Sequence, residues 1–215
     1  MNNLIRERKG MLILSLLVIL LPMGVGLFLW NQLPDQVPIH FGLNGQADNY
    51  AGKAFVVFGL PLLMAALQVL LLVVTMADPK GKNIAAKPFG LLLWICPLVS
   101  LFCGTMTYAK ALALPVDINL VGGLFLGLMF LVVGNYLPKC KQTYTVGIRL
   151  PWTLADEDNW AYTHRLGGKV GTIGGLVILA LTFLRLPALQ FVVILVLVLI
   201  PTVASFLYAR RRETK

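Results

Sequence analysis

Long apolar runs alternate with short polar segments along the whole chain. Each run is close to the ~20 residues that an α-helix needs to cross the hydrocarbon core of a bilayer. The fifth run is the least complete: it is strongly apolar over 170–184 and needs Gly167, Gly168 and a snorkelling Lys169 or Arg185 to reach full length. The pattern predicts an all-α integral membrane protein, a single domain over 1–215 with about six transmembrane helices. The predicted spans are residues 11–30, 54–76, 89–109, 118–137, 167–186 and 188–208.

Composition and charge agree with a multi-pass membrane protein. The chain is 58% hydrophobic and only 13% charged, against roughly 25% charged residues in soluble domains. Its net charge of +9 comes from basic loops and tails, which are typical of membrane topology rather than of nucleic-acid binding. Fifteen of the 18 Lys and Arg residues fall on one predicted side, and only Lys53, Lys110 and Arg185 fall on the other. This bias predicts that both termini are cytoplasmic.

The spans carry little polar chemistry. Gln68 is their most polar interior side chain, and we expect it to make an interhelical hydrogen bond. Small-xxx-small spacing occurs at Gly123 and Gly127, and again at Gly167, Gly171 and Gly175, which indicates close helix contacts. The three cysteines, Cys96, Cys103 and Cys140, form no disulfide framework and are interpreted as packing residues or reduced thiols.

Residues 31–53 form the predicted extracellular segment. Pro34 and Pro38 exclude a helix through its start. Apolar residues then alternate with other residues over 39–43, which is typical of a strand, and an Asn-Gly pair at 44–45 predicts a turn. We therefore expect a small ordered loop with hairpin character on the outer membrane surface.

Residues 134–169 form the predicted cytoplasmic segment, and its second half carries helix signals. Thr153 is the predicted N-cap, with Asp156 three residues later as in a capping box. Gly167 is placed to stop this helix, which we expect to lie at the inner interface before the fifth span. Arg149 is expected to pair with one of the acidic residues at 156–158.

Catalytic and metal chemistry find little support in the sequence. His40 and Asp48 could ligate a metal, but two ligands on a short loop are too few for a site, so no metal or cofactor is predicted. His164 with Asp156 or Glu157 could perform acid–base chemistry, yet there is no nucleophile elbow, two-His metal pattern or phosphate loop. We expect a protein that is not an enzyme. The alternatives are a membrane enzyme built on the cytoplasmic segment and a small-molecule exporter with a path past Gln68.

Both polar segments resemble known bacterial families. The outer segment resembles a small bacterial domain of unknown function with a Leu-Pro-x3-Pro-x-His pattern. Its motif positions here are Leu33, Pro34, Pro38, His40, Gly45, Asp48 and Lys53.

The inner segment resembles the SdpI family, immunity proteins against the sporulation-delay peptide toxin of spore-forming bacteria. Thr143 stands where that family more often has Asn. The matching positions are Gly134, Asn135, Pro138, Lys139, Gly147, Arg149, Pro151, Trp152, Thr153, Leu154, Trp160, Thr163, His164, Arg165 and Gly168.

This resemblance implies a bacterial cell-membrane protein that gives resistance to a membrane-active peptide. It also implies a signalling role, in which the cytoplasmic segment docks a transcriptional repressor. The implied partners are therefore the lipid bilayer, a secreted peptide toxin outside and a repressor protein inside, with no direct nucleic-acid contact. Oligomeric state is not indicated by any pattern in the sequence.

Overall fold

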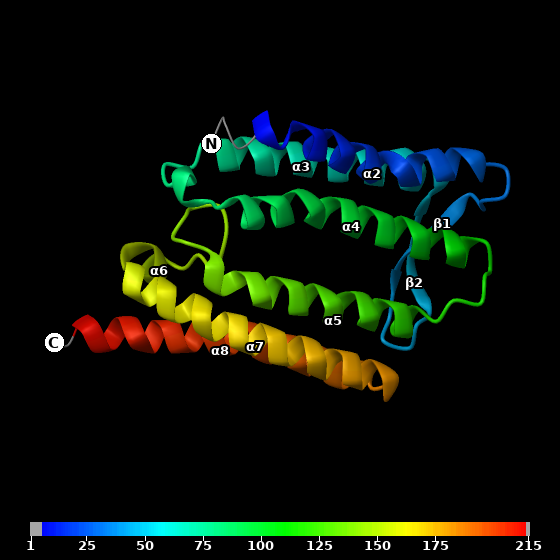
Figure 1. Cartoon of the computed structure of the whole chain (residues 1–215). Helices are drawn as coiled ribbons and strands as arrows, with labels where there is room; N and C mark the ends of the chain where they lie inside the picture. The colour runs from blue at the N-terminus through cyan, green and yellow to red at the C-terminus, as the bar shows by residue number, and fades with distance from the viewer. Residues whose placement is uncertain (1–5, 214–215) are drawn as a thin grey trace. The chain divides into compact units, whose positions relative to one another are not determined.

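A computed structural model describes residues 6–213, and six of its helices are long and apolar enough to span a membrane (Figure 1). The predicted all-α multi-pass architecture is confirmed. The long helices are α2 (Lys9–Phe28), α3 (Leu60–Met76, entered through a π-helical turn at Phe55–Gly59), α4 (Ala86–Ala111), α5 (Ile118–Tyr136), α7 (Glu157–Phe183) and α8 (Pro187–Glu213). Shorter elements are strands β1 (Gln36–Phe41) and β2 (Ala47–Gly52), helix α6 (Pro151–Ala155), and 3₁₀ turns at Gly81–Asn83 and Leu137–Lys139.

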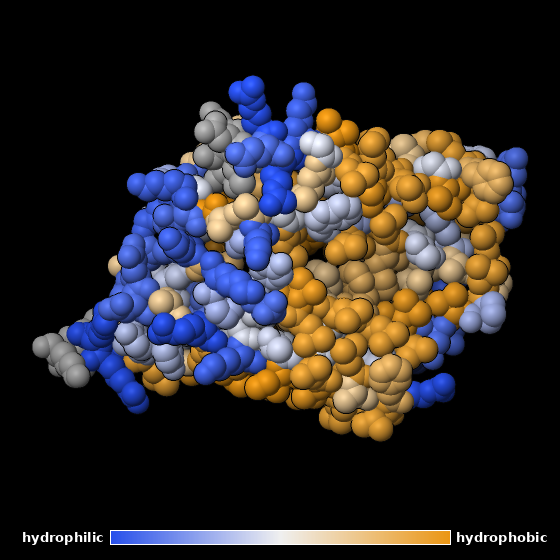
Figure 2. Space-filling view, in the orientation of Figure 1, coloured by the Kyte–Doolittle hydropathy of each residue, from blue (hydrophilic) through white to orange (hydrophobic). Residues whose placement is uncertain are grey.

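The long helices expose apolar side chains, as helices in lipid do. Leu17, Leu62 and Phe191 are each more than half exposed. On the face drawn in Figure 2, hydrophilic residues gather where α7 begins and α8 ends, and hydrophobic residues cover the later part of α7. A soluble protein rarely exposes apolar surface on this scale, so the bilayer is the solvent for these faces.

The chain divides into two compact units. The first unit comprises the residues up to Met76 together with Phe89–Ile118, and the second comprises Ala77–Pro88 and Asn119 onward.

In the first unit, β1 and β2 form an antiparallel hairpin, as the outer segment predicted. Gly45 occupies the turn with φ of 73°, a conformation that favours glycine. The hairpin is tied to the helices through a small buried core. That core consists of Leu33, Val37, Val56, Val57 and Tyr108.

Hydrogen bonds from side chains to backbone carbonyls link the helices of the first unit. Gln68 Nε2 donates to the Leu93 carbonyl at 3.3 Å, which confirms the predicted interhelical role of this residue. Ser100 donates to the Ile19 carbonyl and Tyr108 to the Pro22 carbonyl, each at 2.9 Å. Bonds of this kind contribute on average about 0.6 kcal/mol each in a membrane.

In the second unit, glycines bring α5 and α7 into backbone contact. A Cβ on Gly134 would lie 2.6 Å from the Thr172 amide nitrogen, and one on Gly175 would lie 2.8 Å from the Gly127 carbonyl oxygen. The predicted close contact through small residues is confirmed.

Helices α7 and α8 form an antiparallel hairpin with a very short connection. Arg185 occupies the turn in the left-handed region, with φ of 57°. Gln190 at the start of α8 donates to the Thr182 hydroxyl near the end of α7 at 2.8 Å. The tight hairpin follows from the few residues available between the two apolar runs.

The predicted helix stop at Gly167 is wrong. Helix α7 runs without interruption from Glu157 to Phe183, and the predicted interfacial helix is its first turns. Gly167 is buried within this helix, where a Cβ would meet Ile148 and Leu137 at 2.8 and 2.9 Å. Gly167 therefore permits close packing and does not form a left-handed helix stop. At about 40 Å, α7 is longer than the ~30 Å hydrocarbon core, so its polar start can extend beyond the lipid tails.

The glycine contact predicts a clear difference between two substitutions on α5. Gly134→Ala should destabilise the protein by about 1–3 kcal/mol, because the new methyl group would press on the α7 backbone. Gly122→Ala is the matched control, since nothing lies within 4 Å of its added Cβ. Thermal unfolding of the detergent-purified variants measures both effects. Equal melting temperatures for the two variants would contradict the α5–α7 packing.

Candidate functional site: a loop held by side chains against the start of α7

The most elaborately built polar region of the second unit is the segment that precedes α7. We call residues 77–85 and 137–165 together the loop module. Within the described chain, no amide of residues 143–150 donates to another backbone carbonyl. Instead, four alternate amides donate to side chains: Tyr144 to Asp78, Val146 to Thr143, Ile148 to His164, and Leu150 to Thr153, at 2.9–3.1 Å. Side-chain acceptors therefore hold the loop in place of a helix or sheet.

Asp78 anchors the loop from the segment that follows α3. Its side chain is largely buried, with the whole residue 8% exposed. One carboxylate oxygen accepts from the Tyr144 amide at 2.9 Å and from the Thr145 hydroxyl at 2.7 Å. The other accepts from the amide of Lys80 at 2.8 Å. Three donors satisfy the carboxylate, as a buried charge requires.

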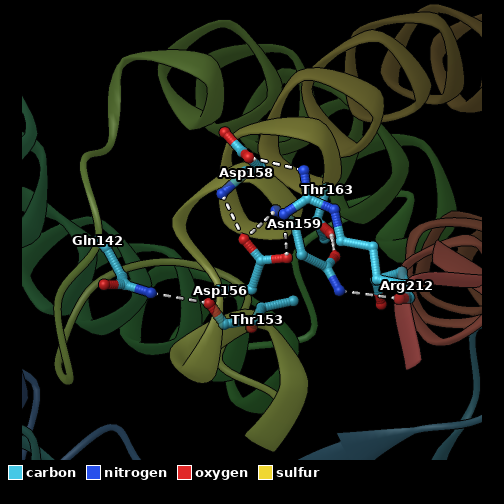
Figure 3. A network of polar contacts seen from close by, with 8 residues as sticks. Gln142, Thr153, Asp156, Asp158, Asn159, Thr163 and Arg212 are labelled. Atoms are coloured by element: carbon cyan, nitrogen blue, oxygen red, sulfur yellow. Dashed lines mark hydrogen bonds and ion pairs between the residues drawn. The ribbon is translucent and has the colours of Figure 1, made fainter. Parts of the chain in front are cut away.

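Gln142 joins three parts of the module, and Figure 3 shows its bond to Thr153. Its Nε2 donates to the carbonyls of Thr153 and Leu154 at 2.9 and 3.0 Å. Its Oε1 accepts from the Lys80 ammonium, and its backbone carbonyl accepts from the Asn83 side chain at 2.9 Å. The Gln142 side chain is buried, so losing it would leave several polar groups without partners.

His164 closes the loop onto α7. Its Nε2 accepts from the Ile148 amide at 3.0 Å, so the ring proton lies on Nδ1, which donates to the Trp160 carbonyl at 2.9 Å. The ring stacks on Trp160 with centroids 4.0 Å apart. Both ring nitrogens are thus used in structural hydrogen bonds, and neither is free to act as the general base that the enzyme alternative needs.

Gly147 is the residue that permits this arrangement. Its φ of 123° is strained for residues with a side chain. An added Cβ would also lie 2.3 Å from His164 Nε2 and 2.8 Å from the Trp160 ring. Trp160 in turn donates from Nε1 to the Cys140 carbonyl at 2.8 Å, which ties the beginning of the loop to the same helix face.

Two helix starts lie in the module, and the predicted N-cap was assigned to the wrong one. Asp156 is the cap of α7: its side chain accepts from the amides of Asp158 and Asn159 at 2.8 and 3.3 Å. Thr153 lies inside the short helix α6, which begins at Pro151. There the Thr153 hydroxyl accepts from the Leu150 amide. The sequence spacing fits both arrangements, and the chain uses Thr153 to hold the loop instead.

The predicted ion pairs of Arg149 are also wrong. Arg149 donates to the Tyr144 carbonyl at 2.7 Å. The acidic residues pair with Arg212 near the end of α8, which contacts Asp156 at 2.9 Å and Asp158 at 2.7 Å (Figure 3). These groups are partly exposed, so the pairs orient the α8 end more than they stabilise the fold.

A second polar network joins α7 to α8. Asn159 is fully buried, donates to the Ser205 carbonyl at 3.0 Å and accepts from the Thr163 hydroxyl at 3.0 Å. Trp152 Nε1 donates to the Ser205 hydroxyl at 2.9 Å. Thr163 and Trp152 were predicted from the sequence as motif residues. In the structure Trp152 bonds to Ser205 directly, and Thr163 is linked to Ser205 through Asn159.

The remaining inner motif residues lie around the end of α5. Gly168 packs directly under Pro138, where a Cβ would lie 2.4 Å from the proline ring. Asn135 is exposed. Lys139 and Arg165 are exposed and line a cavity of about 610 Å³.

The outer motif residues support the hairpin of the first unit. Leu33 lies in the buried core, and Pro38 pairs with Tyr50 across the strands. Lys53 lies 3.4 Å from Asp35 and over the Trp30 ring at 5.0 Å. Pro34 is exposed just before β1.

His40 and Asp48 face each other across the hairpin. His40 Nδ1 lies 2.5 Å from an Asp48 carboxylate oxygen, and the two side chains are 68% and 51% exposed. His40 thus bonds across the hairpin to Asp48. Among the described residues, no group of three or more His, Cys, Asp or Glu side chains could hold a metal ion.

Several residues that build the module were not singled out from the sequence. They are Asp78, Gln142, Asn159 and Arg212. Asp78 lies 66 residues from its partner Tyr144, so no local pattern links the two. A lone acidic residue in an otherwise basic loop was the one available signal.

The module geometry predicts a local effect of Asp78→Asn. An amide at this position can accept less well and brings two unwanted donors, so the loop should lose about 1–3 kcal/mol of local stability. Trypsin cleavage after Lys141 and Arg149 in the folded, detergent-purified protein measures this opening. Asp35→Asn is the matched control, because the Asp35 side chain is 97% exposed. Unchanged cleavage in Asp78→Asn would contradict the anchoring role.

Comparison with known proteins agrees with both resemblances. Residues 17–65 match the model of a domain of unknown function, DUF1648, and residues 139–209 match that of the SdpI/YfhL protein family. Over 206 residues the chain is 26% identical to Immunity protein SdpI of Bacillus subtilis (strain 168). The aligned region covers 93% of this chain and 96% of that protein. No solved structure matches significantly. The predicted resemblance is thereby confirmed: residues 139–209 match the SdpI/YfhL family model, in a multi-pass membrane protein that is similar to an immunity protein over nearly its whole length.

Proposed function

We propose that this protein is a membrane immunity protein that protects a bacterium against a membrane-active peptide and reports the presence of that peptide to a cytoplasmic partner. The observation that carries the proposal is the similarity to Immunity protein SdpI across 93% of the chain. The ordered hairpin and the loop module, which are the two polar segments that carry the sequence motifs, support it.

The order of the spans supports opposite faces for these two segments. Three candidate spans, containing α3, α4 and α5, separate the hairpin from the inner motif. An odd number of crossings leads to the opposite face. The excess of Lys and Arg in the loops beside the motif favours the cytoplasm for that face and the cell exterior for the hairpin.

The hairpin is proposed as the surface that meets the peptide. Tyr50 and Leu43 are each more than half exposed on it. The exposed His40–Asp48 contact lies on the same small hairpin and adds polar groups to this surface. A combination of exposed aromatic, aliphatic and polar groups suits an amphipathic peptide at the membrane surface.

The loop module is proposed as the surface that docks the cytoplasmic partner, a transcriptional repressor in this hypothesis. A loop held by buried acceptors presents its exposed side chains in a fixed arrangement, which lowers the entropic cost of binding. Tyr144 and Arg149 are the exposed side chains at its centre.

The two alternative functions have less support. The enzyme alternative relies on His164, whose ring nitrogens are both engaged in structural bonds. The exporter alternative relies on Gln68, which is buried and donates to a helix carbonyl. The middle turns of α2, α3, α4, α5 and α8 also lack the charged residues and histidines that coupled transport usually needs, and Lys169 in α7 is exposed.

Immunity is tested by a killing assay in a sensitive Gram-positive host. Cells expressing the wild-type protein should survive the sporulation-delay peptide. His40→Ala should lower the highest peptide concentration that the cells survive at least about tenfold, because the proposal makes the hairpin an energetically central contact. Gly52→Ala in β2 is the control, because nothing lies within 4 Å of its added Cβ. Full protection by His40→Ala at equal expression would contradict the hairpin's role. A lack of protection by the wild-type protein would contradict immunity to this peptide.

Reporting is tested by the proteins recovered with the membrane fraction. The wild-type protein should retain a DNA-binding repressor at the membrane when peptide is added, and Gly147→Ala should abolish this retention because its methyl group would displace His164. Quantitative mass spectrometry of membrane fractions measures it, with Gly10→Ala as the control at an open position. Equal retention by a normally inserted Gly147→Ala protein would contradict docking on the loop module.

A further inference from the structure

The loop module contains a cavity that the proposed immunity function does not use. It has a volume of about 610 Å³ and lies between the segment following α5 and the first turns of α7. Four charged side chains line it: Lys139, Lys141, Arg165 and Glu157. Three cations against one carboxylate give the cavity a positive character.

The neutral polar groups of the cavity wall are already occupied. Gln142 donates to two carbonyls and accepts from Lys80, and Asn83 donates to Gln142. His164 has partners on both ring nitrogens, and Trp160 donates to Cys140. The wall is therefore fixed and offers few neutral donors to a ligand.

The three cationic side chains of the cavity differ from its neutral groups because they have no ion-pair partner within residues 6–213. Within residues 6–213, no acidic side chain lies within ion-pair distance of Lys139, Lys141 or Arg165. Lys139 lies over the Tyr136 ring, with its ammonium 4.8 Å from the centroid. The cavity thus brings three positive charges together, and its own chain does not neutralise them with an ion pair.

The position of the cavity indicates where its ligand would come from. Lys139 is the last residue of the span Ile118–Lys139, so the cavity lies at the end of a membrane-crossing segment. Lipid phosphates lie at this level, just beyond the hydrocarbon core. Basic pockets between helix ends are suited to anionic headgroups.

We propose that this cavity binds a phosphate group, contributed by an anionic lipid headgroup or by a soluble phosphate compound. Arg165 supplies a planar guanidinium that can bind two phosphate oxygens, and Lys139 and Lys141 supply point charges for the others. A phosphate matches three cations better than a carboxylate does, because it has more oxygens and can carry more charge. Glu157 opposes binding and sets its strength.

The test uses the full-length protein in neutral-lipid nanodiscs. Native mass spectrometry counts bound dioleoylphosphatidylglycerol against dioleoylphosphatidylcholine, and calorimetry measures inorganic phosphate and glycerol 3-phosphate. The pocket variant is Lys141→Gln with Arg165→Gln. Its control is Lys82→Gln with Lys169→Gln, which removes the same charge from exposed positions that do not line the cavity.

The wild-type protein should prefer the anionic phosphatidylglycerol to the zwitterionic phosphatidylcholine, or bind the soluble phosphates. The pocket variant should lose at least about tenfold in affinity for the probe that binds, and the control should keep it. Glu157→Gln should bind more tightly, by a few fold, because a negative charge leaves the cavity. Retention of phosphatidylglycerol alone identifies a lipid headgroup as the source, whereas binding of the soluble probes alone identifies a soluble phosphate compound. Absence of binding to every probe would overturn the proposal, and so would an equal loss in the pocket and control variants.

Discussion

The backbone amides of the loop before α7 must find acceptors although the loop forms neither helix nor sheet. This constraint is severe near a membrane, because an unpaired amide costs more where water is scarce. The chain meets it with four side chains, which together accept from every second amide from Tyr144 to Leu150, one amide each. Two of the four acceptors, Asp78 and His164, come from outside the loop. The loop therefore cannot form independently of α7 and of the segment after α3, which supply them.

The packing of α5 against α7 fixes where those acceptors lie. Gly134 and Gly168 let the end of α5 approach α7 so closely that Pro138 lies directly against the helix. The loop thus leaves α5 at a defined place and returns to α7 at His164, with Gly147 giving the ring room. Because α7 is continuous through Gly167, movement of its membrane-embedded part would be carried to the face that holds the loop. This rigid connection is the physical basis for proposing that the module reports events in the membrane.

Much of this architecture could be predicted from the sequence, and most of the failures involve contacts between distant residues. The six spans, the hairpin turn at Gly45 and the glycine contacts follow from local periodicity and composition, so they were predicted. The N-cap at Asp156, the partner of Arg149 and the continuity of α7 at Gly167 were predicted wrongly. Two of these involve residues far away in the chain: Arg212 takes the acidic partners expected for Arg149, and Leu137 packs on Gly167. The cap of α7 is local, and the prediction chose Thr153 because the spacing fits both Thr153 and Asp156. The family resemblance located the site, but it did not indicate Asp78, whose importance comes from a contact across 66 residues.

The central claim is that the loop is a prefolded surface held by side-chain acceptors. Hydrogen exchange resolved to single amides, on the protein in lipid nanodiscs, tests it directly. The account predicts strong protection at Tyr144, Val146, Ile148 and Leu150 and faster exchange at the intervening amides of residues 145, 147 and 149. Uniformly fast exchange over residues 143–150 would contradict it, because the loop would then be unfolded in the absence of a partner.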